Sequence, residues 1–478
     1  MNILIQSFDR DAEFACETVA RLNASGHAAY VTYAQETSLG RHLLKILLAV
    51  EERYLRITRN AAAMPPPENF RADLIVDLTG ERRSEDTAVL RVEINGHRNI
   101  LDGLASVKTK TRHATVVAWL DDWPVARASP MISRQTFFVV NRDELYVGVQ
   151  SLIMHTIARL GGGPLDALSI DRMPKVSTCF ICAYVAHLTT ALCRRLLQVF
   201  IGRRHRWPAW QTAWRFIEGP GIAETRRLDG TPFSVLPDDG QRFYADPFVL
   251  EHQGDTYIFV EEFPYATGKG VISMSKVGKD GCASVPRQVL EEQHHLSYPN
   301  VFKDKGEIFM VPESGAALEV VLYRAERFPD RWARHALLIA GHNINDATFM
   351  QRDGRLWMFA TERFGKGSES DTMVVFSAPD LLGPWAPHKL NPILIDKAGS
   401  RPGGHIIEDD GRFFLPVQDG SEVYGGGLGL REIIVVDDDS VVLGPVEAIG
   451  TGSAWARRGI HTLNRTDHLE VVDTTWCD

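Results

Sequence analysis

The chain has few cysteines, and no pattern among them that would tie it together. Six occur in 478 residues, and their scattered positions fit a protein of a reducing compartment better than a disulfide scaffold. Cys179 and Cys182 have redox or metal spacing, but no second pair accompanies them. We interpret them as part of an apolar helix, with metal binding as the alternative.

Long runs of one charge are also missing. The net charge is −9, and no block of like charges is long enough to form a tail, so the sequence offers no broad cationic field for nucleic acid. The first ten residues lack the basic start and apolar core of a secretory signal. We therefore expect a cytoplasmic protein with no nucleic-acid partner.

Residues 1–165 alternate short apolar runs with helical patterns. Strands are expected at 2–9, 28–34, 72–80, 89–95, 114–121 and 136–142, and helices at 12–25 and 38–55. This alternation predicts a Rossmann-like, doubly wound α/β domain with a mostly parallel sheet. No Gly-x-Gly-x-x-Gly follows the first strand, so nothing marks a dinucleotide site.

An apolar stretch within residues 166–206 separates this domain from the rest of the chain. Residues 176–193 contain no Asp, Glu, Lys or Arg, and basic pairs follow at 194–195 and 203–204. We expect an apolar helical linker packed between two domains. The alternative is an interfacial helix that brings residues 176–204 into peripheral contact with the inner face of a membrane.

From residue 207 to 478 the chain repeats one two-strand pattern: an apolar strand, a turn on Gly or Asp, and an aromatic-rich strand. The copies span 245–263, 298–314, 346–363, 403–420 and 460–474. They recur at steps of about 50 residues, a length that fits one four-stranded propeller blade. The sequence therefore predicts an all-β, five-bladed β-propeller.

The last copy leaves too little chain to complete a blade. Residues 214–219 and 232–238, just before the first copy, can supply the two missing outer strands. Pairing N-terminal with C-terminal strands in one blade closes the ring and removes exposed sheet edges. We predict this closure.

Polar residues recur where the innermost strands begin and where the second strands end. The central channel of a propeller gathers such positions, and a ring of carboxylates there is costly unless it is hydrated or holds a polar ligand. Sugars are ligands of this kind. We expect Asp246 to act as a general base, Glu313 as a general acid and Asp346 as a charge modulator.

Further residues of the ring are candidates for substrate binding through hydrogen bonds or, for Arg401, through a donor phosphate. They are Glu262, Tyr298, Asn300, Glu362, Asp371, Arg401, His405, Asp419 and His461. A divalent cation could also bind the carboxylates, although no ligand spacing demands one.

The blade starts carry a resemblance to known propellers. The motifs at 244–249, 296–303, 345–351, 401–407 and 459–465 resemble those of family-43 and family-32 glycoside hydrolases. They are more closely similar to the N-terminal domain of plant glucosamine inositolphosphorylceramide transferase and its bacterial relatives. The resemblance implies a carbohydrate-active fold in which Asp246 matches the catalytic aspartate of blade one.

Two departures from these families matter. Hydrolases of this fold carry a second aspartate in blade two, where this chain has Tyr298 and Asn300; its aspartate comes in blade three, as Asp346. Bacterial relatives often carry an N-terminal formyltransferase-like domain. Residues 1–160 resemble a degenerate version of it, without a recognisable Asn-His-Asp set near 92–100.

The sequence thus favours a glycosyltransferase that moves a sugar from an activated donor to a glycan acceptor in surface polysaccharide or glycolipid biosynthesis. The expected substrate is an activated sugar, and no other cofactor is implied. Two alternatives stay open: a hydrolase or phosphorylase acting on furanosides, and a non-catalytic glycan-binding or assembly protein.

Overall fold

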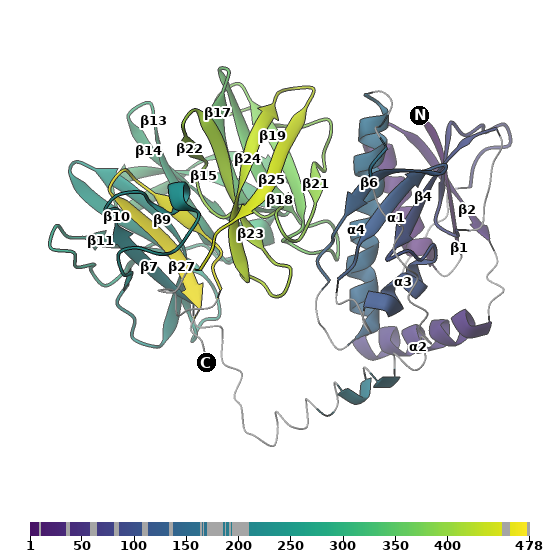
Figure 1. The fold of residues 1–478 in the computed structure, drawn as a ribbon, viewed down its shortest axis with the longest axis horizontal. Coiled ribbons are helices and arrows are strands. Elements are labelled where there is room, and N and C mark those ends of the chain that lie inside the picture. Colours follow the sequence, from purple (N-terminus) through teal and green to yellow (C-terminus); the bar gives the residue numbers. More distant parts are fainter. Residues whose placement is uncertain are drawn as a thin grey trace. The chain divides into compact units, whose positions relative to one another are not determined.

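The computed structural model describes two compact units of the chain. One comprises Met1–Arg203 with Gly365–Ser368, and the other Arg204–Phe364 with Glu369–Asp478. The described residues are 1–8, 11–34, 39–57, 65–80, 86–107, 113–132, 137–162, 165, 167–169, 185–186, 188–190, 193, 210–451 and 459–475. Figure 1 shows their helices and strands.

The N-terminal unit is an α/β domain built on one six-stranded sheet with the order β2-β1-β3-β4-β5-β6. Neighbours from β2 to β4 pair in parallel, whereas β5 and β6 run antiparallel. The elements are β1 (Asn2–Phe8), α1 (Ala12–Ala24), β2 (Ala28–Ala34), α2 (Leu39–Leu55), β3 (Leu74–Asp77), β4 (Ala88–Ile94), α3 (Ile100–Ser106), β5 (Val116–Leu120), β6 (Trp123–Ala128) and α4 (Phe138–Leu160).

One predicted strand of this unit is wrong. Residues 136–142 were expected to form a strand, but helix α4 begins at Phe138 and continues to Leu160. Most of this helix is buried, with Phe138, Val139 and Leu145 fully enclosed. A short apolar run has the same composition in a buried helix and in a buried strand, so its periodicity alone cannot separate the two.

The apolar stretch between the domains lies largely outside the described residues, and so do Cys179 and Cys182. Residues 185–186, 188–190 and 193 are described and helical. Among the residues that the structure describes, no helix is long and apolar enough to span a membrane. The predicted linker and its membrane contact remain predictions, and so does the formyltransferase-like character of the N-terminal unit.

The C-terminal unit is the predicted five-bladed propeller, with one antiparallel sheet per blade. The first blade consists of β9 (Arg242–His252), β10 (Asp255–Pro264), β11 (Val271–Val277) and β12 (Arg287–Leu290), and the second of β13 (Ser297–Asp304), β14 (Glu307–Glu313), β15 (Glu319–Arg327) and β16 (Arg331–Ala340). The third consists of β17 (Ile344–Arg352), β18 (Arg355–Glu362), β19 (Thr372–Ala378) and β20 (Ala386–Pro387), with β21 (Leu394–Ile395) also paired to β19, and the fourth of β22 (Ile407–Asp409), β23 (Arg412–Asp419), β24 (Gly427–Val436) and β25 (Val441–Ala448). The fifth consists of β26 (Leu463–Arg465), β27 (Leu469–Thr475), β7 (Trp210–Phe216) and β8 (Ser234–Val235).

The predicted closure of the ring is confirmed. In the fifth blade the C-terminal strand β27 pairs antiparallel with β7, from Leu469 opposite Phe216 to Thr475 opposite Trp210. Strand β8 then pairs with β7 as the outermost strand. The blade is therefore shared between the two ends of the propeller sequence.

Each pair of neighbouring blades shares a hydrophobic cluster. Phe248 and Phe259 of the first blade pack with Val301 of the second, and Trp214 of the fifth packs with Val249 of the first. Equivalent clusters join the second blade to the third, the third to the fourth and the fourth to the fifth. The core thus runs around the ring and leaves the polar strand starts for the axis.

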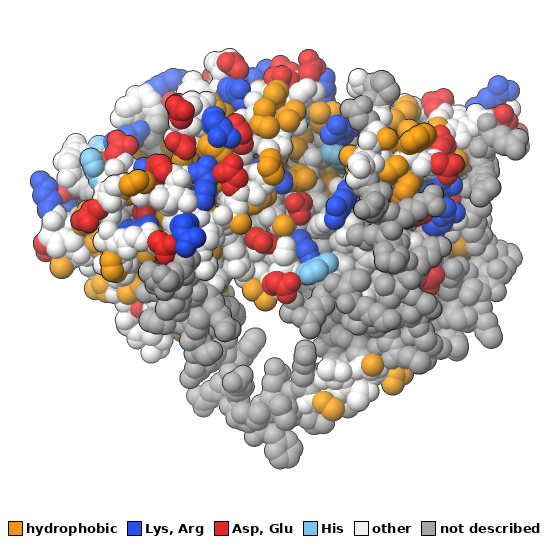
Figure 2. Space-filling view, viewed as in Figure 1, with side chains coloured by type: hydrophobic (Ala, Val, Ile, Leu, Met, Phe, Trp, Pro, Cys, Tyr) orange, Lys and Arg blue, Asp and Glu red, His pale blue; other side chains and the backbone are white. Residues whose placement is uncertain are grey.

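The surface of the propeller carries acidic and basic side chains interspersed over the face seen in Figure 2. Many of them form exposed pairs, such as Arg324 with Glu307 at 3.3 Å. Such exposed pairs contribute little to stability.

A buried ion pair links the two strands that close the ring, and removing one partner should destabilise the propeller. Arg215 of β7 bonds Glu470 of β27 at 2.5 Å, and the second Glu470 oxygen accepts the Ile222 N–H at 3.0 Å. We expect Glu470→Ala to lower the free energy of unfolding of the propeller by about 3–5 kcal/mol, because it leaves a buried guanidinium unpaired. Urea denaturation measures this, with Glu307→Ala as the exposed control that should leave the denaturation midpoint nearly unchanged. Equal shifts in the two variants would contradict it.

Candidate functional site

The same backbone irregularity starts the innermost strand of the first three blades. Asp246, Tyr298 and Asp346 have left-handed backbones, with φ of +48°, +44° and +54°. At each, the strand register skips, so that two residues oppose one on the neighbouring strand, as in a β-bulge. Such φ values cost about 1–3 kcal/mol each and persist only where the surroundings enforce them. The repeated bulge turns these side chains into the centre of the ring.

His461 joins the first and third blades at this centre. Its Nδ1 lies 2.9 Å from Asp246 Oδ1, and its Nε2 lies 3.2 Å from Asp346 Oδ2. All three residues are buried. Although burial opposes the charged ring, the two carboxylates raise the pKa of His461 to about 10. His461 is therefore an imidazolium that donates from both nitrogens.

Arg401 is the second buried cation of this network. Its Nε donates to Asp346 Oδ2, its Nη1 to Ser370 Oγ at 3.1 Å, and its Nη2 to Glu313 Oε2 at 3.4 Å. The guanidinium also lies over the ring of Tyr424, 5.2 Å from its centroid. One arginine thus fixes Asp346 and Glu313 relative to each other.

Asp346 and Glu313 hold protons unequally. Burial and the charge of Asp346 raise the pKa of Glu313 well above its ordinary value. Burial would raise the pKa of Asp346 as well, but Arg401 and His461 outweigh it and hold that pKa below its ordinary value. Asp346 Oδ1 is buried without a protein donor, and the Glu313 carboxyl is joined to Asp346 through Arg401. Two neighbouring carboxyls with separated pKa values make an acid and a carboxylate in one site.

Asp473 holds the fifth blade against the first. Its Oδ1 accepts the N–H of His461 at 2.7 Å and of Thr462 at 2.9 Å, and its Oδ2 accepts the N–H of Asp246 at 3.3 Å. Burial, against the opposing charge of His461, raises the pKa of Asp473 to about 6. Asp473 therefore fixes the backbone on which two functional side chains stand.

Asp246, His461 and Asp473 also offer ligand atoms within 4.8 Å of one another, as a cation site would. However, both His461 nitrogens carry protons toward carboxylates, and Asp473 already accepts three backbone N–H groups. A cation would have to replace these donors. The donor set fits proton chemistry better than a divalent cation.

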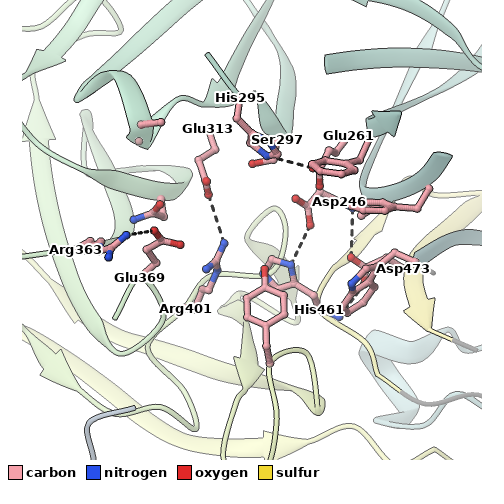
Figure 3. A pocket seen from close by; sticks show the side chains of 18 of the residues that line it. Asp246, Glu261, His295, Ser297, Glu313, Arg363, Glu369, Arg401, His461 and Asp473 are labelled. Atoms are coloured by element: carbon pink, nitrogen blue, oxygen red, sulfur yellow. Dashed lines mark hydrogen bonds and ion pairs between the residues drawn. The ribbon is translucent and has the colours of Figure 1, made fainter. Parts of the chain in front are cut away.

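The network forms the floor of a cavity of about 530 Å³ within the propeller, shown in Figure 3. Aromatic rings form part of its wall: Phe243 and Phe263 stack with centroids 4.8 Å apart, and Trp210 meets Tyr424 edge-on at 6.2 Å. The lining residues are Trp210, Phe243, Ala245, Asp246, Glu261, Phe263, His295, Ser297, Glu313, Gly315, Ala316, Asn343, Asn345, Arg363, Glu369, Arg401, Tyr424, His461 and Asp473. Polar groups converging beside apolar rings are typical of a small-molecule site.

The structure brings the three predicted catalytic residues into this network. Asp246 and Asp346 share His461, and Asp346 and Glu313 share Arg401. Asp246, Glu313, Arg401 and His461 line the cavity, whereas Asp346 lies fully buried behind Arg401. The roles expected for these residues remain proposals.

Three candidates for substrate binding lie in a buried hub instead of on the cavity wall. The Tyr298 hydroxyl accepts the Gly404 N–H at 2.7 Å. Asn300 donates to the Ala347 carbonyl at 2.7 Å, and its Oδ1 lies 2.8 Å from His405 Nε2. Tyr298 and Asn300 are fully buried and His405 is partly buried, and their hydrogen bonds reach other blades. They join the blades beneath the site.

Four more candidates lie away from the cavity lining: Glu262, Glu362, Asp371 and Asp419. Glu262 bonds Arg242 and Ser273, and Glu362 lies 2.8 Å from His342. Successive side chains of a strand point to opposite faces, so an offset of one residue moves a carboxylate off the wall.

Several lining residues are absent from the predicted site, although Glu261 belongs to the Glu261–Glu262 pair that the sequence marks as polar at a second-strand end. Glu261 immediately precedes Glu262 in β10, and its side chain faces the cavity. The bulge sets this direction, because it shifts the register so that Glu261 pairs with Ala245. His295 comes from the segment between β12 and β13, which no repeat pattern marks, and Ser297 opens β13 within the motif 296–303. Trp210 and Tyr424 lie outside the five repeated segments.

The raised pKa of His461 predicts a pH dependence of stability. In the unfolded chain an ordinary histidine loses its proton near pH 6.5, whereas folded His461 keeps it to about pH 10. Between these values the folded state binds more protons, so the stability that this charge supplies declines as pH rises. We expect wild type to lose more stability from pH 7 to 10 than His461→Gln does, as measured by urea denaturation. Parallel pH curves would contradict this.

Comparison with known proteins identifies relatives of the propeller. Residues 237–473 match the family model for the N-terminal region of glucosamine inositolphosphorylceramide transferase 1. The protein of that name from Oryza sativa subsp. japonica is 36% identical over 243 residues, which cover 48% of this chain and 32% of the relative. Its counterpart from Arabidopsis thaliana is 35% identical over 211 residues, covering 43% and 27%. The chain thus spans about a third of the length of these relatives.

Among solved structures, an exo-β-1,3-galactanase from Clostridium thermocellum aligns with a TM-score of 0.35 and 14% identity, covering 42% of this chain and 49% of that one. The strand pairing described above establishes the five blades independently of this alignment. By sequence and by fold, the C-terminal unit is a five-bladed propeller similar to the N-terminal domain of glucosamine inositolphosphorylceramide transferase 1.

Proposed function

We propose that the propeller is a carbohydrate-active enzyme, a glycosyltransferase that moves a sugar from an activated donor to a glycan or glycolipid acceptor. One observation carries the proposal: Glu313 on the wall of an aromatic-lined cavity and the buried Asp346 are joined through Arg401, with the pKa of Glu313 raised and that of Asp346 lowered. Such a pair suits the cleavage of a glycosidic bond, in which an acid protonates the leaving oxygen while negative charge stabilises the sugar.

In this proposal Glu313 donates its proton to the leaving oxygen of the donor. Its raised pKa keeps it protonated until transfer, and the Arg401 Nη2 contact at 3.4 Å stabilises the carboxylate that forms. Asp246 and Asp346, bridged by His461, supply negative charge near the reacting carbon. The sequence makes Asp246 a candidate for the base that activates the acceptor.

The names of the relatives support transfer over hydrolysis, since each is a transferase acting on a glycolipid. About two thirds of each relative has no aligned counterpart in this chain, so the activity of the whole relative comes to this propeller as a proposal. We further propose that the protein works in the cytoplasm, with residues 176–204 near the membrane surface. Activated sugars are made there, and the acceptors would be membrane-bound.

The proposal is tested first by ligand binding. UDP-N-acetylglucosamine, UDP-glucose, GDP-mannose and p-nitrophenyl arabinofuranoside are each added to the purified protein, and the thermal midpoint is recorded. A nucleotide sugar that raises Tm supports transfer. Release of p-nitrophenol from the furanoside would instead establish the hydrolase alternative.

Glu313→Gln should remove the proton donor without changing the shape of the side chain. We expect it to lower transfer from the bound nucleotide sugar to inositol phosphorylceramide by about 100- to 10,000-fold, as loss of a general acid does. The control is Glu319→Gln, which alters a carboxylate paired with Arg334 at 2.8 Å on β15, away from the cavity lining. Transfer is measured as labelled glycolipid.

Equal activity in these two variants would exclude Glu313 as the acid. If Asp246→Ala with Asp346→Ala also leaves transfer intact, the propeller is a binding or assembly module and not the catalyst.

A further inference from the structure

The cavity contains a second carboxyl site on the wall formed by the first blade. Glu261 of β10 and His295, which follows β12, both line the cavity, and His295 Nε2 lies 3.2 Å from Glu261 Oε1. The Glu261 side chain is 9% exposed and that of His295 38%. Figure 3 shows this pair beside Ser297, across the cavity from Arg401.

The backbone of Gly270 fixes the orientation of this pair. Its N–H donates to His295 Nδ1 at 2.9 Å, so Nδ1 has no proton and the protonated Nε2 is the nitrogen that faces Glu261 Oε1 at 3.2 Å. A Cβ at Gly270 would lie 2.6 Å from His295 Cε1, 3.0 Å from Glu261 Oε1 and 2.5 Å from the Leu296 carbonyl oxygen. Glycine is therefore required at this position for the pair to form.

Glu261 keeps one oxygen for a ligand. His295 takes Oε1, and within the described part of the chain no protein group donates to Oε2. Burial, opposed by the hydrogen bond from His295 and reinforced by the nearby charge of Asp246, raises the pKa of Glu261. A buried carboxyl with a free oxygen on a cavity wall is costly unless a ligand hydroxyl or water completes its hydrogen bonds.

Asp246 is held differently. Its Oδ1 accepts from the His461 imidazolium at 2.9 Å, and its Oδ2 accepts the Tyr298 N–H at 3.3 Å. Both oxygens already have protein donors, and one of these donors is a cation. Asp246 is therefore placed to supply charge to the network, whereas Glu261 is placed to accept a proton from a ligand.

We propose that Glu261, oriented by His295 and Gly270, is the residue that binds and deprotonates the acceptor hydroxyl. This inference rests on the proposed function and assigns to Glu261 the base role that the sequence suggested for Asp246. The ligand is the hydroxyl of a neutral sugar or cyclitol ring. Its apolar face can lie on Phe263, whose ring centroid is 5.9 Å from that of His295.

The acceptor O–H bond breaks as its oxygen forms a bond to the anomeric carbon, and the proton passes to Glu261. The bond from that carbon to the leaving oxygen breaks at the same time. The leaving oxygen takes its electron pair and a proton from Glu313. Subsequent proton exchange with water restores both carboxyls.

The main test replaces Glu261 by glutamine. With the donor and acceptor used for the Glu313 variants, we expect Glu261→Gln to reduce kcat by about 100- to 10,000-fold, as loss of a general base does, with Tm unchanged. The matched control is Glu292→Gln, which alters a half-buried carboxylate that accepts one hydrogen bond, from the Tyr323 hydroxyl at 2.8 Å. Glu292 is not among the residues lining the cavity.

A second variant keeps the inference testable if Glu261→Gln does not fold. His295→Phe removes the Nε2–H donor, and because that donor favours the charged form of Glu261, its loss should move the acidic limb of the pH–kcat profile to higher pH. A residue with only a structural role would change Tm but not the position of this limb. The control is His342→Phe, which breaks another histidine–glutamate pair, 2.8 Å long and away from the cavity lining.

The outcomes separate this inference from the proposed function. If Glu261→Gln keeps the activity of Glu292→Gln, or if His295→Phe leaves the acidic limb unmoved, Glu261 is not the base. If Glu313→Gln nevertheless abolishes transfer, the proposed function stands without this inference. If neither Glu261→Gln nor Glu313→Gln reduces transfer, both the inference about Glu261 and the proposed function are contradicted.

Discussion

The buried bridge from Asp246 through His461 to Asp346 is the interaction on which the rest of the site depends. It joins the first, third and fifth blades at the axis, and together with Arg401 it holds the pKa of Asp346 below its ordinary value, although burial opposes this. Burial and the charge of Asp346 raise the pKa of Glu313. The guanidinium and the imidazolium thus set the protonation of this carboxyl pair.

The architecture supplies this bridge through a repeated backbone feature. A left-handed bulge at the same point of three blades turns two aspartates and one tyrosine inward. Tyr298, at the bulge of the second blade, joins blades to one another, whereas Asp246 and Asp346 are acidic residues of the site. Asp473, at the end of the strand that closes the ring, fixes the backbone of His461 and Asp246. The strand that closes the propeller therefore also positions the site, and a substitution that displaces this strand would disturb both.

Much of this could be predicted from the sequence, because repeats report architecture directly. The five copies predict the blades and their closure, and the polar residues at strand starts predict which aspartates meet. Side-chain direction could not be predicted so well. The choice between Glu261 and Glu262 depends on a one-residue bulge, and the position of His295 depends on a loop. In the N-terminal unit, the run at 136–142 lacks the periodicity that would distinguish a buried helix from a strand.

The proposed catalysis depends on a protonated Glu313 beside an ionised Asp346. Difference infrared spectroscopy at neutral pH, comparing wild type with Glu313→Gln and with Asp346→Asn, measures these protonation states. We expect a carboxylic-acid carbonyl band in wild type that disappears in Glu313→Gln and titrates at lower pH in Asp346→Asn, where the neighbouring charge is gone. A wild-type spectrum in which Glu313 contributes only carboxylate bands would contradict it.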